Sequence, residues 1–162
     1  MDLSTQYLGL ELKNPIIMGS SGLTSSVEKI KNAEKCGAGA VVLKSIFEEE
    51  VALEFADFMR TAKNFATDSQ YFDYDGRKVP IDYYNYVVRE ENLKKYVTLI
   101  EDCKKAVSIP VIASINCFLQ SVEWMAYAKQ LEAAGADALE LNMFFPPTDF
   151  KQKRADRENI YF

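Results

Sequence analysis

The feature that most restricts the fold of this 162-residue chain is a strand-helix-strand pattern that occurs twice. Asn14 to Ser21 resembles Ile109 to Asn116, and in both a proline precedes a short apolar strand with a polar end. Glu34 to Lys44 resembles Glu132 to Asn142, and in both a glycine follows a helix end and precedes another apolar strand. Such a glycine closes a helix, and nearly continuous apolar strands are typical of buried parallel sheets. The pattern predicts an α/β fold with four parallel strands.

Helical spacing of apolar residues predicts three helices between these strands. The first spans Ser25 to Lys35 and opens with the capping pair Ser25 and Glu28. The second spans Glu91 to Val107, and the third spans Ser121 to Ala134. The expected core positions are Leu93, Tyr96, Val97, Ile100 and Cys103 on the second helix, and Val122, Met125, Ala126 and Leu131 on the third.

The segment at about 47–90 is too long for a simple crossover, so part of it is predicted to be an insertion. It contains a tyrosine-rich stretch, 71–86, with the turn signal Asp75-Gly76. Two interpretations stay open here. The stretch is either a surface hairpin with aromatic packing or a loop that covers a ligand.

Composition excludes several functional classes. The net charge of −5, with 19 basic against 24 acidic residues, is not that of a nucleic-acid or anionic-membrane binder. The chain has no histidine, which excludes histidine-activated nucleophiles and histidine-bearing metal sites. The acidic run Glu48 to Glu50 is typical of a solvated face, so no metal site is predicted.

Three cysteines without a C-x-x-C motif indicate reduced thiols, and no apolar run reaches the roughly 20 residues of a membrane span. We therefore expect a cytoplasmic protein.

Polar side chains are predicted to meet at the carboxyl ends of the four strands. Because side chains alternate along a strand, Glu140 and Asn142 share a face, as do Ser114 and Asn116. The repeat places Lys44 in the equivalent position on the second strand. A ligand beyond the carboxyl ends would satisfy these groups, which is the usual place for one in a parallel α/β fold. The alternative is an internal Lys44 to Glu140 ion pair, with Asn142 capping the loop.

Five short strings occur in order along the chain: 14–22 (NPIIMGSSG), 37–45 (GAGAVVLKS), 82–84 (DYY), 114–116 (SIN) and 140–142 (ELN). Together they resemble the flavin-dependent dihydroorotate dehydrogenases, particularly the soluble class and its dihydroorotate dehydrogenase-like branch. The resemblance implies a (βα)8 TIM-type barrel with FMN at its carboxyl face, of which residues 1–162 are the N-terminal half with about four βα units. It also implies hydride transfer from dihydroorotate to FMN to give orotate, a step of pyrimidine biosynthesis.

The same resemblance implies a set of site residues. Backbone at Ser20, Ser21 and Gly22 would lie against the flavin ring, and Ser45 would support the cofactor. Lys44 would lie at the pyrimidine edge, where a fixed cation stabilises the reduced flavin. Asn116 and Asn142 would hydrogen-bond the flavin, and Lys44 and Asn142 would also contact a small-molecule substrate.

The chain departs from the family pattern at the catalytic base. Where the family has Cys or Ser after the fourth strand, this sequence has Phe145, which cannot accept a proton. Cys117 is a candidate for a displaced base, although a buried cysteine is usually a small apolar residue. The alternative function is a non-catalytic barrel that binds a ligand or serves in assembly. Because the first and fourth strands would have open edges, a homodimer that completes the barrel is a further alternative.

Overall fold

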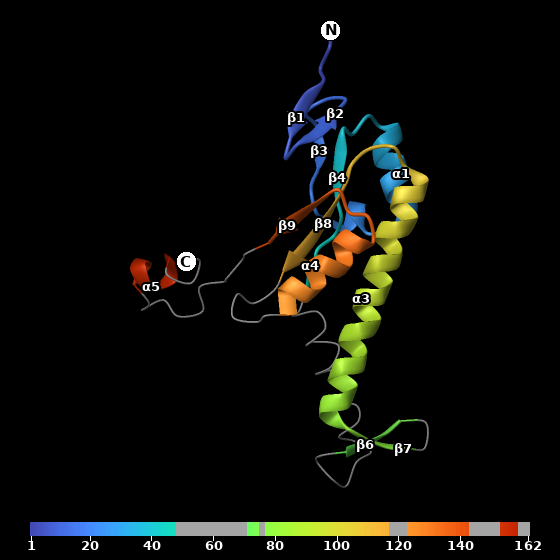
Figure 1. Ribbon diagram of the computed structural model, residues 1–162, viewed down its shortest axis with the longest axis vertical. Coiled ribbons are helices and arrows are strands. Elements are labelled where there is room, and N and C mark those ends of the chain that lie inside the picture. The colour runs from blue at the N-terminus through green and yellow to red at the C-terminus, as the bar shows by residue number, and fades with distance from the viewer. Residues whose placement is uncertain (48–70, 75–76, 117–122, 143–152, 159–162) are drawn as a thin grey trace.

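The computed structural model describes residues 1–47, 71–74, 77–116, 123–142 and 153–158, and its centre is a parallel sheet (Figure 1). The sheet contains β3 (Ile17–Met18), β4 (Ala40–Val42), β8 (Val111–Asn116) and β9 (Ala138–Leu141), in that order. A two-residue strand, β5 (Ile46–Phe47), pairs with the end of β8. The predicted α/β fold with four parallel strands is confirmed. Strands that follow one another in chain order are compatible with part of a TIM-type barrel.

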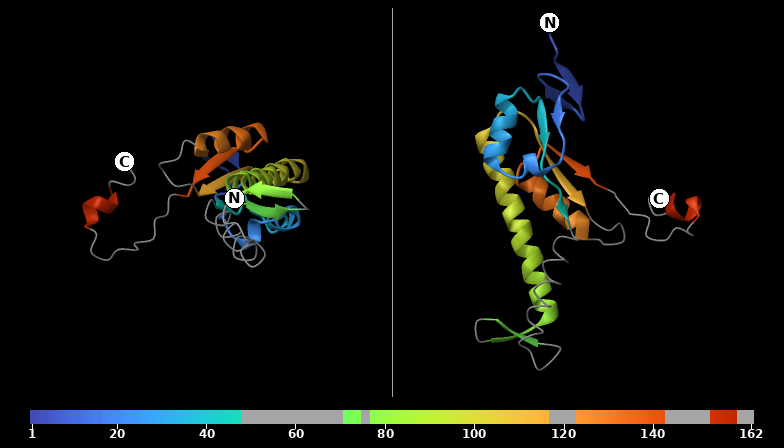
Figure 2. Two further views of the ribbon diagram at one scale, coloured as in Figure 1. Left: turned by 90° about the horizontal axis from the view of Figure 1, so that it is seen from below. Right: turned by 180° about the vertical axis from the view of Figure 1, so that it is seen from behind.

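Three helices provide the apolar layer beside the sheet. They are α1 (Val27–Lys35), α3 (Ile81–Ala106) and α4 (Glu123–Ala133), and α1 and α3 lie side by side (Figure 2). The α3 helix begins at Ile81, ahead of the predicted Glu91. The buried core is formed by side chains of the three helices and by alternate side chains of the strands, which point to the helix side of the sheet. The largest core residues include Ile30, Leu43, Leu93, Ile100, Ile115, Leu131, Val41, Val111 and Cys103.

The predicted helix cap at Ser25 is wrong. The N-cap of α1 is Ser26, whose side chain makes no capping hydrogen bond. A short 3-10 helix, η1 (Gly22–Thr24), precedes α1 and carries its own capping box between Ser21 and Thr24. Ser25 ends η1, and its Oγ donates to the carbonyl oxygen of Gly22 at 3.0 Å. The unpredicted η1 therefore uses the residue that the sequence pattern assigned to α1.

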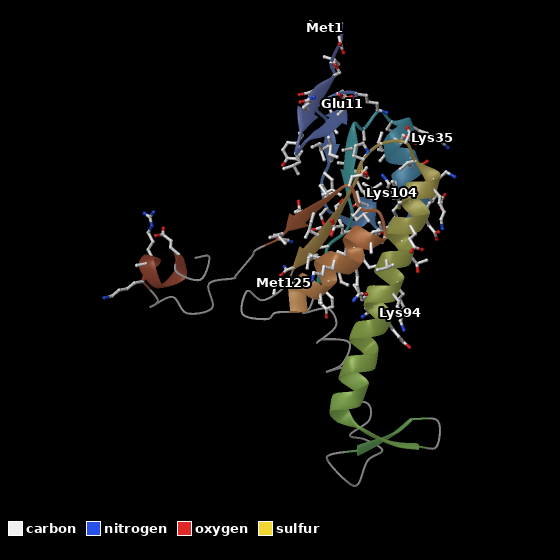
Figure 3. The ribbon with its side chains drawn as sticks, viewed as in Figure 1. Met1, Glu11, Lys35, Lys94, Lys104 and Met125 are labelled. Carbon is white, nitrogen blue, oxygen red and sulfur yellow. The ribbon has the colours of Figure 1, made fainter. Side chains whose placement is uncertain are left out.

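The predicted inner face of α4 is also partly wrong. Met125 and Ala126 are exposed, and Figure 3 shows Met125 at the start of the helix. Leu131 is buried as predicted, and Tyr127 and Ala128 pack against the same core. Leu131 lies four positions after Tyr127 and three after Ala128, which is the spacing of one helix face. The predicted Val122 lies outside the described residues.

Two antiparallel hairpins lie outside the parallel sheet, one near its amino edge and the other at the amino end of α3 (Figure 1). The strands β1 (Thr5–Tyr7) and β2 (Leu10–Leu12) were not predicted, and they join through Leu8 and Gly9, both with positive φ. They lie near the amino ends of β3 and β4 (Figure 1). The strands β6 (Tyr71–Tyr74) and β7 (Arg77–Pro80) pair around the predicted turn, so a hairpin is present there. Whether this hairpin covers a ligand stays a prediction. A last short helix, α5 (Arg154–Glu158), lies near the C-terminus.

Candidate ligand site at the carboxyl edge of the sheet

A cavity of about 540 Å³ opens at the carboxyl ends of the parallel strands. The residues around it come from the loop after β3, the segment after β4, and the end of β9. They are Ser20, Ser21, Gly22, Lys44, Ser45, Glu140, Leu141 and Asn142. The set includes every residue predicted to bind the cofactor except Asn116, which ends β8 and is not among the described residues lining the cavity. Tertiary structure thus brings together side chains that lie more than a hundred positions apart in the sequence.

A chain of hydrogen bonds runs from this cavity to a carboxylate. The Ser114 Oγ donates to Glu140 Oε1 at 2.6 Å, because a carboxylate only accepts. The Ser45 Oγ lies 2.6 Å from the Ser114 Oγ, whose proton is already committed, so Ser45 must donate to Ser114. The Ser45 oxygen then accepts from the Ser20 Oγ at 3.1 Å and from the Asn142 Nδ2 at 3.4 Å. Glu140 therefore sets the direction of every hydrogen bond in the chain.

This direction also fixes the orientation of the Asn142 side chain. Its Nδ2 must point to Ser45, since the Ser45 hydroxyl has no second proton to offer. The Asn142 Oδ1 can then accept a hydrogen bond, and the second Nδ2 hydrogen can donate one, to a ligand in the cavity. A neighbouring acceptor and donor suit the edge of a heterocycle that carries both a carbonyl and an N–H group.

A bulge after β4 explains why two consecutive residues line the cavity. Val42 is paired with Ile112, but Ile46 is paired with Ile115, so the first strand has one extra residue between these pairs. In a regular strand, neighbours such as Lys44 and Ser45 would point to opposite faces. The extra residue changes that alternation and re-aims the side chains, as β-bulges do. Both residues therefore reach the same cavity.

Tyr96 of α3 contacts the backbone of β8 beside this bulge. Its buried hydroxyl accepts a hydrogen bond from the Ser114 N–H at 3.0 Å and donates to the Ser114 carbonyl oxygen at 3.2 Å. Burial raises the pKa of Tyr96 to about 12, and the nearby Glu140 carboxylate acts in the same direction. The phenol is thus neutral at physiological pH, as a hydroxyl that donates to a carbonyl must be. The apolar periodicity of α3 predicted Tyr96 in the core but gave no signal for this contact.

Gly22 provides bare backbone at the rim of the cavity. It is not among the glycines with positive φ, and a β-carbon added there would meet no atom within 4 Å. Neither backbone conformation nor internal packing therefore requires glycine at this position. Open space next to bare backbone, with Lys44 and Asn142 on the same cavity, suits a flat ring with polar edge groups.

Several predicted features lie elsewhere. Cys117 and Phe145 are outside the described residues, so their predicted roles stay predictions. Within the described ranges, no group of three or more acidic or cysteine side chains has the geometry to hold a metal ion. None of the helices described here is both long and apolar enough to cross a membrane.

Comparison with known proteins indicates a distant relationship. No protein-family model matches the chain. It is similar to the catalytic subunit of dihydroorotate dehydrogenase B (NAD(+)) from Thermoplasma volcanium, with 24% identity over 152 residues. The match covers 90% of this chain and 42% of that protein, so the chain spans less than half the length of this relative. The similarity supports a dihydroorotate dehydrogenase-like relationship.

Proposed function

We propose that the chain forms the N-terminal half of an FMN-binding βα barrel in a flavin-dependent oxidoreductase of the dihydroorotate dehydrogenase-like kind. One observation carries this proposal. Residues from both halves of the repeat meet around one cavity, and they include Ser20 to Gly22, Lys44, Ser45 and Asn142, the positions that the family resemblance assigns to the cofactor. The distant similarity to a dihydroorotate dehydrogenase subunit supports the same class of chemistry.

Each residue has a distinct part in this proposal. FMN, when bound, supplies the acceptor for a hydride from the substrate. The Lys44 ammonium would stabilise negative charge at the pyrimidine edge of the cofactor. Asn142, held by Ser45, would offer its carbonyl oxygen and amide hydrogen to a ligand. The Ser21 to Gly22 backbone would form the surface against which the ring packs.

We further propose a small cyclic amide as the substrate. The donor and acceptor of Asn142 match an amide edge, and Lys44 favours an anionic group next to it. Dihydroorotate has this chemistry, but its oxidation to orotate needs a base other than Phe145.

Replacing Lys44 with methionine should weaken FMN binding by tenfold to a hundredfold. The loss of one charge-assisted hydrogen bond costs about 1.5–3 kcal/mol, which corresponds to this range of affinity. Titration of the purified chain with FMN, followed by flavin fluorescence, measures the change. Lys94→Met is the matched control, because Lys94 is exposed on α3 (Figure 3). Equal affinities of the Lys44 variant and the wild type would contradict the proposed role.

Replacing Gly22 with valine should remove FMN binding while leaving the fold almost unchanged. A β-carbon there would meet no protein atom within 4 Å and Gly22 is exposed, so the free energy of unfolding should change by less than about 0.5 kcal/mol. It would occupy the surface against which the flavin is proposed to pack. Denaturant unfolding and FMN titration of the same sample separate the two effects. A Gly22→Val variant that binds FMN normally would show that the ring does not lie there.

A second candidate function is ligand binding without redox chemistry, and Phe145 at the family's base position favours it. This protein would bind FMN or another heterocycle, yet transfer no electrons to an added acceptor from any cyclic amide. Electron transfer from one such substrate to a dye, dependent on FMN, would exclude it.

A homodimer that completes the barrel is tested by measuring the molecular mass of the protein in solution. Among the described strands, β3 and β9 are the end strands of the sheet, and paired end strands from two copies would close both edges. Sedimentation equilibrium at micromolar concentration should then give twice the 18.4 kDa of one chain. A mass equal to one chain would contradict the dimer.

A further inference from the structure

We infer that Tyr96 is a positioning residue for the candidate site: its hydroxyl replaces the strand acceptor that the Ser114 N–H lacks at the bulge and thereby keeps Lys44 and Ser45 at the cavity. The structural part of this inference stands on hydrogen bonds within the chain. Its consequence for ligand affinity rests on the proposed function.

The backbone hydrogen bonds show where the strand ladder is interrupted. The Leu43 N–H donates to the Ile112 carbonyl oxygen at 2.9 Å, as expected for parallel strands. Two residues later, a regular ladder would bring the Ser45 N–H to the Ser114 carbonyl oxygen and the Ser114 N–H to the Leu43 carbonyl oxygen. Instead, the pairing of Ile46 with Ile115 places the Ile46 N–H at the Ser114 carbonyl oxygen. The Ser45 N–H donates to the Ser20 Oγ at 3.0 Å. This hydrogen bond ties Ser45 to the loop after β3 and away from β8.

Tyr96 provides the acceptor that the Ser114 N–H loses at this point. The Ser114 N–H donates to the Tyr96 hydroxyl at 3.0 Å, and the same hydroxyl donates to the Ser114 carbonyl oxygen at 3.2 Å. Ser114 is completely buried, so water cannot satisfy its N–H. A hydroxyl both donates and accepts, so the Tyr96 oxygen serves the N–H and adds a second donor to the carbonyl oxygen, which the Ile46 N–H already contacts.

The bulged and the regular arrangement compete for the backbone groups of Ser114. Without the Tyr96 hydroxyl, the Ser114 N–H would be a buried donor without an acceptor, which is strongly unfavourable. The nearest remedy is a regular ladder, in which the Leu43 carbonyl oxygen accepts from the Ser114 N–H and the Ser45 N–H replaces the Ile46 N–H at the Ser114 carbonyl oxygen. That change would close the bulge and break the contact between Ser45 and Ser20. Lys44 and Ser45 would then follow regular alternation, and only one of them would face the cavity.

The test compares Tyr96→Phe with wild type in the full 162-residue chain. Phenylalanine keeps the aromatic ring in the core and removes only the hydroxyl. NMR of the ligand-free chain reports the amides of Ser45 and Ser114, and FMN titration reports the cavity. Two controls separate positioning from general destabilisation. Cys103→Ala removes a buried group from the same helix, and Tyr7→Phe removes a hydroxyl from an exposed tyrosine.

We expect Tyr96→Phe to shift both amide resonances, to bring the Ser45 amide within cross-peak distance of the backbone of Ser114, and to weaken FMN binding at least tenfold. Cys103→Ala should lower the unfolding midpoint without either effect, and Tyr7→Phe should change nothing. Unchanged Ser45 and Ser114 amides in folded Tyr96→Phe would overturn the inference, as would equal losses of affinity in Tyr96→Phe and Cys103→Ala.

A measurement on wild type covers the case in which Tyr96→Phe fails to fold. The Tyr96 hydroxyl proton should exchange slowly with water and give a cross-peak to the Ser114 amide. Absence of that cross-peak would overturn the inference. If wild type does not bind FMN, the proposed function fails, but the amide measurements still decide the role of Tyr96.

Discussion

Replacing Gly39 with alanine is expected to destabilise the chain by about 3 kcal/mol, since overpacking a rigid site costs this much. A β-carbon at position 39 would overlap the backbone oxygen of Asn14 and lie 2.9 Å from its Oδ1. Neither group can move easily. The Gly39 N–H donates to the Ile16 carbonyl oxygen at 2.7 Å, and the Asn14 Nδ2 donates to the Gly37 carbonyl oxygen at 2.8 Å. The clash therefore forces β3 away from β4.

Thermal unfolding measures this effect, and a fall in the midpoint of roughly 6–12 °C corresponds to the expected loss for a protein of this size. Gly19→Ala is the matched control, because a β-carbon there would meet no atom within 4 Å. It should leave the midpoint within a degree or two. A midpoint for Gly39→Ala equal to that of Gly19→Ala would show that β3 and β4 do not approach as closely as described.

The chain is also expected to lose about 3 kcal/mol of stability between pH 8 and pH 11 from two buried groups. Burial raises the pKa of Tyr96 from 10.0 to about 12 and that of Cys103 from 9.0 to about 11. In this range the unfolded chain releases protons that the folded chain keeps, so rising pH favours unfolding. The stabilisation is complete below the unfolded pKa values and disappears as the pH passes the folded ones. By pH 11 the loss is about 2 kcal/mol from Cys103 and about 1 kcal/mol from Tyr96.

Urea unfolding at pH 8 and pH 11 measures the difference. Cys103→Ala and Tyr96→Phe each lack one titrating group, so each should lose less stability over this interval than wild type. Tyr7→Phe, at an exposed tyrosine, should lose as much as wild type. A loss that is the same in all four proteins would place the alkaline sensitivity in other groups.

The main architecture was predictable because it depends on local patterns. Apolar runs after Pro15 and Pro110, and the glycines at 37 and 135, identify the strands and helix ends. Both glycines have positive φ, as closing a helix requires. The capping pair at Ser25 was wrong because several nearby serines could cap, and only the unpredicted η1 decides among them. The start of α3 was missed because the sequence before Glu91 lacks a clear apolar period.

The candidate site was predictable in part. Strand alternation correctly placed Ser114 and Glu140 on one face, and the structure joins them by a hydrogen bond. The same rule failed after Val42, because an extra residue between two paired positions has no local signature. Alternation from Val42 therefore did not predict that Lys44 and Ser45 reach the same cavity.

By itself, the sequence determined the order of the strands, the helices between them and the edge at which polar side chains gather, because these follow from short-range periodicity and chain direction. Only the tertiary structure decided the β4 bulge, the contact of Tyr96 with Ser114, and the hydrogen-bond chain that orients Asn142. Each of these depends on groups far apart in the chain competing for the same donor or acceptor. That competition is settled by which groups are buried together, a property that no local pattern contains.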